Sequence, residues 1–227
     1  MNQSTTTNRR RILKLLAASA AAPIIFPSRL FGADAQSNKI TLGCIGVGWQ
    51  GGSNLDNFLG QSDCQIVAIC DVDEKLMQEG IDKVNAHYGN KDCKGYKDFR
   101  ELLALGVIDA VAISTPDHWH AIQSIAAANA GKDIFCEKPL SYKLGEGIAM
   151  VNAVQKNGRI WQTGSWQRSV ASFRWAVELV QNGYIGKVTR VEVGLPSGHN
   201  DFANTGDNKP ASSVPAGVNL EMWTGPA

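Results

Sequence analysis

Residues 46–51 read G-V-G-W-Q-G, the glycine spacing of a loop that holds phosphates. They follow an apolar run and open a helical stretch, which is the context that the motif requires. The first glycine permits a tight turn, the second lets the backbone approach a pyrophosphate, and the third lets a helix pack closely on a strand. Free N–H groups at the helix N-terminus favour the phosphates. We therefore expect a dinucleotide at Gly46, Val47, Gly48, Trp49, Gln50 and Gly51; a glycine-rich turn without a ligand is the alternative.

Asp71 ends the next apolar run, about 20 residues past the last glycine of the motif. A carboxylate there accepts hydrogen bonds from the adenosine ribose hydroxyls and repels a 2′-phosphate. The pattern therefore favours NAD over NADP. Asp73 could take the same role, and a basic residue from elsewhere in the chain could still make NADP the cofactor.

Two further groups of polar residues follow apolar runs, S-T-P-D-H-W-H at 114–120 and F-C-E-K-P-L at 135–140. In a doubly wound sheet, ligands lie beyond the carboxyl ends of the strands. We therefore expect the cofactor to lie near Ser114, Thr115, Pro116, His120, Glu137 and Lys138.

Lys138 follows an apolar run, where its charge is costly unless it is used or paired. It could transfer a proton in catalysis, oriented by Glu137, or the two could form a structural ion pair. His118 and His120 are two apart at the start of a helix, so they diverge, and we expect no metal site. His120 is either a packing histidine or a neighbour of the nicotinamide.

Alternating strand-like and helical stretches position these groups. Strands are expected at 40–48, 64–71, 107–115, 132–139 and 159–164, and helices at 51–59, 73–89, 97–105, 118–131 and 141–158. Asp98 and Ser141 are expected helix caps, and Gly89 a helix stop. The alternation predicts a parallel sheet covered on both faces. The predicted fold class is α/β, a Rossmann-type doubly wound sheet of six strands between Lys39 and Gly164.

The pattern changes after residue 165. A helix is expected at 173–183, a strand with one buried face at 187–196, and an extended loop at 197–217. These elements cannot bury a core of their own. We expect a signal peptide at 1–35, the Rossmann domain at 36–165, and at 166–227 the incomplete start of an α+β domain with a mostly antiparallel sheet; an unusually small second domain is the alternative.

The N-terminus has the order of an export signal. Arginines at 9–11 precede Leu13 and Lys14, a mild apolar stretch follows at 15–26, and A-D-A at 33–35 resembles a cleavage site. The arginines resemble a twin-arginine signal, which predicts the twin-arginine export machinery as a partner and a periplasmic or otherwise exported protein. A solvated basic arm before a short helix is the alternative. No cysteine follows the apolar stretch, so we expect no lipid anchor.

Composition narrows the class of protein. Hydrophobic residues make up 44% of the 227 residues and charged residues 19%, as in globular proteins. Residues 1–35 hold five basic and one acidic side chain, so residues 36–227 have 17 basic and 20 acidic ones, a net charge of −3. No basic patch suggests nucleic acid.

The five cysteines lack disulfide or metal spacing, and we expect Cys44, Cys70 and Cys136 to be buried. Reduced cysteines suit folding in the cytoplasm before export.

Together the tracts G-V-G-W-Q-G-G, C-D-V-D, S-T-P-D-H-W-H-A and C-E-K-P-L-S resemble the Gfo/Idh/MocA oxidoreductases, over Lys39 to about Leu195. W-T-G-P-A at 223–227 also resembles a tract of members with signal peptides. The resemblance implies NAD(P)-dependent chemistry on sugars, polyols or inositols, a Rossmann domain, a second sheet domain and often a homo-oligomer. It implies that Lys138 acts at the substrate hydroxyl, that Thr115, Pro116 and His120 flank the nicotinamide, and that Trp166 and Arg168 line the substrate cleft.

One departure from that family concerns the proton relay. Members carry a later D-x-x-x-H, but His199 has Leu195 four residues before it. We therefore expect a chain cut short within its second domain and inactive as it stands. The leading hypothesis is hydride transfer between the nicotinamide and a hydroxyl carbon of a sugar, polyol or glycoside. The alternatives are redox-neutral, NAD-dependent cleavage of glycosides and a non-catalytic protein that holds the nucleotide.

Overall fold

The computed structural model describes residues 38–194 and 213–226. Six strands form one parallel sheet in the order β3-β2-β1-β4-β5-β6, the order of a dinucleotide-binding Rossmann fold. The strands are β1 (Ile40–Ile45), β2 (Cys64–Cys70), β3 (Lys94–Tyr96), β4 (Ala110–Ile113), β5 (Asp133–Glu137) and β6 (Trp161–Gly164). The predicted sheet is confirmed, and β3 is the one strand of it for which no range was predicted.

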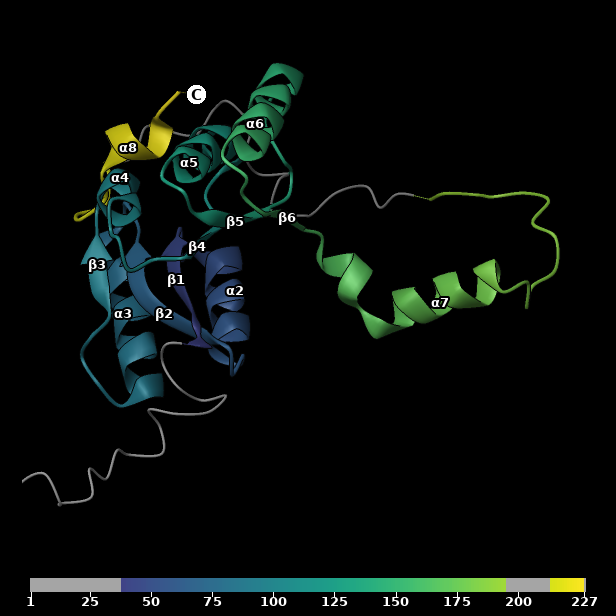
Figure 1. Ribbon diagram of the computed structural model, residues 1–227, viewed down its shortest axis with the longest axis horizontal. Coiled ribbons are helices and arrows are strands. Elements are labelled where there is room, and N and C mark those ends of the chain that lie inside the picture. Colours follow the sequence, from purple (N-terminus) through teal and green to yellow (C-terminus); the bar gives the residue numbers. More distant parts are fainter. Residues whose placement is uncertain (1–37, 195–212, 227) are drawn as a thin grey trace, which may run out of the picture. The chain divides into compact units, whose positions relative to one another are not determined.

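Helices cover both faces of this sheet (Figure 1). α2 (Trp49–Leu59) and α3 (Glu74–Tyr88) lie on one face, and α5 (Asp117–Asn129) and α6 (Leu144–Lys156) on the other, with α4 (Phe99–Leu103) beside α5. Each face buries its own apolar cluster. Leu42, Leu55 and Ile66 lie in the cluster under α2 and α3, and Ile45, Leu102 and Ile113 lie in the other. Because both faces are covered, the strands are continuous apolar runs rather than alternating ones.

Local signals account for most of the helix ends. Asp73 caps α3 by accepting hydrogen bonds from two backbone N–H groups, and Gly89 ends the helix in the left-handed conformation at φ 66°. Asp98 caps α4 as predicted. The cap predicted for α6 was wrong: the helix begins at Leu144, and the Glu146 carboxylate accepts the N–H groups of Tyr142 and Lys143 while the Ser141 hydroxyl bonds to the carbonyl of Lys143.

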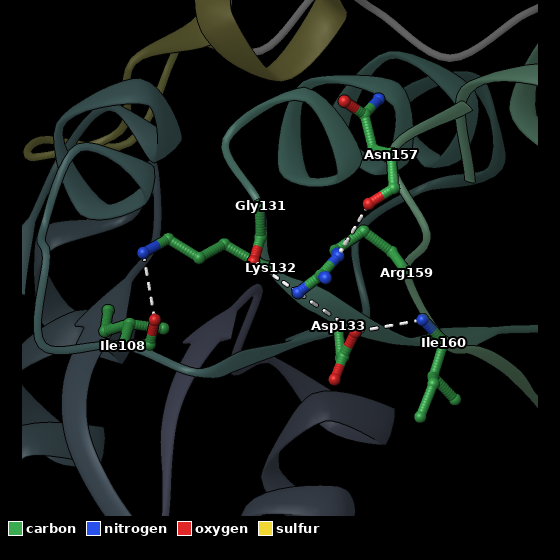
Figure 2. Close-up of polar contacts among 7 residues, drawn as sticks. All are labelled: Ile108, Gly131, Lys132, Asp133, Asn157, Arg159 and Ile160. Atoms are coloured by element: carbon green, nitrogen blue, oxygen red, sulfur yellow. Dashed lines mark hydrogen bonds and ion pairs between the residues drawn. The ribbon is translucent and has the colours of Figure 1, made fainter. Parts of the chain in front are cut away.

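Polar contacts fix the starts of β5 and β6, at the end of the sheet away from the glycine loop (Figure 2). The buried Lys132 ammonium donates to the carbonyl oxygens of Leu105 and Ile108, at 2.8 and 2.9 Å. The Arg159 guanidinium donates to Gly131 O, and the Asp133 carboxylate accepts from the backbone N–H of Ile160. A buried lysine is tolerated here because carbonyl oxygens take the place of water.

Beyond the sheet, the described chain forms η3 (Trp166–Ser169), α7 (Ala171–Gln181) and α8 (Leu220–Thr224). The strand predicted at 187–196 is absent from its described part, residues 187–194, where Val191 and Val193 are exposed. An alternating pattern gives strand propensity, but a strand also needs a partner with which to form hydrogen bonds. The predicted signal peptide at 1–35, His199 and most of the loop predicted at 197–217 lie outside the described residues.

Two expectations concern the chemistry of the described residues as a whole. All five cysteines are buried, as predicted for Cys44, Cys70 and Cys136, and none of them forms a disulfide among the described residues. Burial raises the pKa of Cys93 and of Cys136 to about 12, so these thiols stay protonated at neutral pH. Within 38–194 and 213–226, none of the helices has the length and apolar character needed to cross a membrane, and no group of side chains could hold a metal ion.

Candidate functional site

The glycine loop lies at the carboxyl end of β1, and each glycine has its own structural reason. Gly46 has φ +80°, and a Cβ there would lie 2.9 Å from the backbone of Ser114. A Cβ on Gly51 would lie 2.1 Å from the carbonyl oxygen of Gly46, so this glycine lets α2 pack against the end of β1. At Gly48 the nearest atom is Leu76 Cδ1 at 3.8 Å. Steric contacts with neighbouring protein atoms therefore explain the glycines at 46 and 51. Gly48 has free space beside it, through which a ligand can approach the backbone.

The Asp71 carboxylate is fixed beside this loop. Its Oδ2 accepts the backbone N–H of Val47 at 2.8 Å, and its Oδ1 accepts that of Asp73 at 3.0 Å. Burial raises the pKa of Asp71, and the hydrogen bonds from Val47 and Asp73 oppose that shift. Each carboxylate oxygen keeps acceptor capacity for a ribose hydroxyl, because an ionised carboxylate has about four lone-pair sites.

A cavity of about 250 Å³ opens where β1, β2 and β4 end. Among the residues predicted to bind the cofactor, those that line it are Gly46, Gly48, Asp71, Ser114, Thr115 and Pro116. Its volume lies below the range of about 300–1,000 Å³ of pockets that hold whole ligands, so it fits one end of a dinucleotide. Lys97 also lines the cavity, and its ammonium pairs with Glu74, so this cation is already partnered.

Glu137 forms a buried polar cluster beside the glycine loop. Its side chain is 6% exposed, and its Oε1 accepts from Asn54 Nδ2 at 2.9 Å and from Gln50 Nε2 at 3.3 Å. The Asn54 amide also donates to the Ser114 hydroxyl at 3.0 Å, which joins α2, β4 and β5. Sequence reasoning missed Asn54, although its spacing of four from Gln50 places both on one face of a helix.

Lys138 is exposed on the loop that follows β5. The Glu137 carboxylate accepts the backbone N–H of Lys138 at 3.2 Å, but no ion pair joins the two side chains in the described structure. The alternative of a structural Glu–Lys pair was therefore wrong. Glu137 therefore holds the backbone of this loop rather than the side chain of Lys138.

His120, for which a packing role and a place beside the nicotinamide were the alternatives, does not line this cavity. It is 1% exposed; its Nδ1 lies 2.6 Å from the carbonyl oxygen of Pro139 and its Nε2 lies 2.7 Å from that of Thr115. The buried ring therefore links the loop after β4 to the loop after β5. Thr115 Oγ1 instead donates to Gln123 Oε1 at 2.7 Å, and Gln123 lines the cavity.

The remaining predicted residues lie away from this cavity. Trp49 is 93% exposed on the first turn of α2. Trp166 is 70% exposed and lines an open depression shared with Gln50 and Glu137, the last residue of β5. Arg168 is exposed and does not line either cavity, so its role stays a prediction.

Among the cavity residues that were not anticipated, three come from a distant part of the chain: Val218, Met222 and Trp223. They come from the described segment 213–226, more than a hundred residues along the chain from the glycine loop. A local pattern could not have found them, because their position depends on the chain returning to the sheet.

This arrangement defines a class of protein: a Rossmann domain with a glycine loop, an acidic residue after β2 and a cavity that fits one end of a dinucleotide. No side chain caps the N-terminus of α2, which leaves its first N–H groups for a pyrophosphate. Residues 40–165, more than half of the chain, match the Gfo/Idh/MocA family, described as an oxidoreductase family with an NAD-binding Rossmann fold. The chain belongs to this family.

Similar proteins include inositol dehydrogenases. The chain is 35% identical to the myo-inositol 2-dehydrogenase of Thermotoga maritima over 146 residues, which are 64% of this chain and 42% of that protein. It superposes with a TM-score of 0.60, at 25% identity, on the scyllo-inositol dehydrogenase of Lactobacillus casei solved with NAD(H) and scyllo-inositol, covering 66% of this chain and 43% of that one.

A second kind of relative matches more of the chain. A glycosyl hydrolase family 109 protein of Shewanella pealeana is 29% identical over 212 residues, which cover 82% of this chain and 45% of that protein. The chain spans less than half the length of each of these relatives.

Proposed function

We propose that this chain belongs to an NAD-dependent dehydrogenase that acts on a CH–OH group of a polyol or sugar, with inositols as the first candidates. The observation that carries the proposal is the cavity in which the glycine loop and Asp71 meet, within a chain of this family. The inositol dehydrogenases among its relatives support the choice of substrate.

Separate residues bind the cofactor and transfer the proton in this proposal. The backbone at Gly48 and the N-terminus of α2 bind the pyrophosphate, and Asp71 accepts hydrogen bonds from the adenosine ribose. NAD supplies the acceptor for the hydride. Lys138 Nζ exchanges the proton of the substrate hydroxyl, and Glu137 holds the loop that carries Lys138.

The test uses the intact protein with a panel of inositols, other polyols and sugars. We expect at least one of them to change the absorbance of reduced nicotinamide in a Lys138-dependent manner. No nucleotide binding, together with no signal from any substrate, would exclude the proposal.

A second candidate is redox-neutral cleavage of a glycoside, and the longer match to the family 109 protein favours it. Transient oxidation of one sugar carbon acidifies the neighbouring C–H and permits elimination of the leaving group. Release of a chromogenic leaving group, without net change in reduced nicotinamide, would distinguish this reaction from net dehydrogenation.

We also propose that residues 1–35 direct export by the twin-arginine route, on the order of basic, apolar and small residues. Replacing Arg9, Arg10 and Arg11 by lysine should leave the protein in the cytoplasm of fractionated cells. Export at the normal level would refute it.

A further inference from the structure

Residues 213–226, which we call the strap, are attached to the sheet on one side of the cavity. Gly217 O accepts the backbone N–H of Glu74 at 3.0 Å, and Asn219 N–H donates to Val72 O at 2.9 Å. Val218 forms an antiparallel bridge with Asp73. The strap is thus joined to the loop that directly follows Asp71.

The strap is also attached to the first turn of α5. Trp223 O accepts a hydrogen bond from Trp119 Nε1 at 3.1 Å, and His118 Nε2 lies 3.0 Å from the same oxygen. Gly225 lies directly on the Trp119 ring, where a Cβ would be 2.2 Å from Cζ2. Met222 packs against the apolar cluster that holds Trp119. In Figure 1, α8 accordingly lies beside α5.

These two attachments are on opposite sides of the point where the strand order reverses. The loop after β2 belongs to one half of the sheet, and α5 follows β4 in the other half. A dinucleotide binds across the crevice at this point. Between its attachments, the strap contributes Val218, Met222 and Trp223 to the cavity that contains Gly48 and Asp71.

The chemistry of the lining indicates which end of the dinucleotide the strap contacts. Asp71, the ribose acid, lines the same cavity as the strap, whereas Glu137 and Trp166 line the other depression. Val218, Met222 and Trp223 offer apolar and aromatic surface, which suits the face of an adenine ring.

We propose that the strap is the outer wall of the adenosine subsite, and that the adenosine end of the cofactor leaves only when the strap releases α5 or the loop after β2. The proposal rests on the proposed function in taking NAD as the ligand. The hydrogen bonds of the strap then slow dissociation, while its apolar side chains contribute affinity.

The test measures ligand binding by the intact protein rather than turnover. Gly225→Ala adds a Cβ that collides with Trp119 at a position of φ +50°, which strains any L side chain, and it removes no atom from the cavity. Met222→Ala truncates the cavity wall itself. Gly106→Ala is the matched control, because a Cβ there meets nothing within 4 Å.

Each variant is titrated with NADH, ADP-ribose and nicotinamide mononucleotide, and NADH dissociation is timed by stopped flow. We expect Gly225→Ala and Met222→Ala to weaken NADH and ADP-ribose by about tenfold, to speed NADH release, and to leave nicotinamide mononucleotide unchanged. Gly106→Ala should match the unaltered protein for all three ligands.

The outcomes separate the strap from the cofactor assignment. If the unaltered protein binds NADH and the folded Met222→Ala variant binds ADP-ribose equally well, the strap proposal is overturned while the proposed function stands. An equal loss for nicotinamide mononucleotide would also overturn it, because the strap would then act on the whole site. If the unaltered protein binds neither NADH nor ADP-ribose, the proposed function fails first.

Discussion

The Asp71→Asn variant tests the ribose-binding role of this residue most directly. In the structure both carboxylate oxygens accept backbone N–H groups, from Val47 at 2.8 Å and from Asp73 at 3.0 Å. An amide has one oxygen, so in either orientation one N–H faces an NH₂ group. The ribose hydroxyls also lose an ionised acceptor, worth about 1.5–3 kcal/mol. We therefore expect about a ten- to hundredfold loss of NADH affinity.

The same variant should change the dependence on pH. Burial raises the pKa of Asp71 from its ordinary 3.8, so the folded protein holds this proton more tightly than the unfolded chain. Its contribution to stability therefore falls as the pH rises from about 3.9 through the raised folded pKa, and stays at that reduced level above it. NADH binding has the opposite trend, because it needs the carboxylate and weakens as the pH falls through the raised pKa.

The assay titrates NADH and NADPH by fluorescence over a series of pH values, with urea unfolding measured in parallel. Asp71→Asn should lose the acidic limb of the NADH profile and bind NADPH relatively better, because the charge that repels a 2′-phosphate is gone. A variant that binds NADH as tightly as the unaltered protein, or that keeps the acidic limb, would refute the assignment of Asp71.

Three further substitutions address other parts of the site. Gly51→Ala places a Cβ 2.1 Å from Gly46 O, so NADH binding should be lost and the urea midpoint lowered, and unchanged binding would contradict the packing role. Glu137→Gln leaves one donor of the buried cluster without an acceptor and should cost about 1–3 kcal/mol in urea unfolding; equal stability would mean that the cluster is not held by its charge. Lys138→Ala should lower kcat about 10²–10⁴-fold on the active substrate with NADH affinity unchanged, and a full-rate variant would remove the lysine from the mechanism.

The parts of the fold that follow local rules could be predicted from the sequence. Apolar runs of strand length ended by glycine or acid gave five strands in nearly their observed positions, because a buried parallel strand needs apolar residues on both faces. The Asp98 cap and the Gly89 stop depend on neighbours within one turn. β3 was not predicted, because a three-residue strand that contains glycine is too short to show a hydrophobic pattern.

The contacts between distant segments could not be predicted in this way. His120 was a candidate for the cofactor because it follows β4, but its ring is directed by carbonyls on two different loops. The pairing of Glu137 with Asn54 joins positions 83 residues apart. The contacts of the strap are a further example, because no sequence pattern in residues 213–226 predicts that they contact the loop after Asp71. Such contacts depend on the topology that brings strand ends together rather than on sequence spacing.

The strap and the proposed N-terminal export signal bear on one question, which is how a protein that uses NAD could work if it is exported. If residues 1–35 direct export of the folded protein, the cofactor must survive where little free NAD replaces it. Opening the strap at one attachment breaks two hydrogen bonds, either those with Val72 and Glu74 or those with Trp119 and His118. At about 0.5–1.5 kcal/mol for each hydrogen bond, opening costs roughly 1–3 kcal/mol, which slows release by about 5- to 150-fold. The purified intact protein should therefore keep NAD through dialysis, and Gly225→Ala should lose it. Loss of NAD from both at the same rate would mean that retention, if the protein is exported, has another cause.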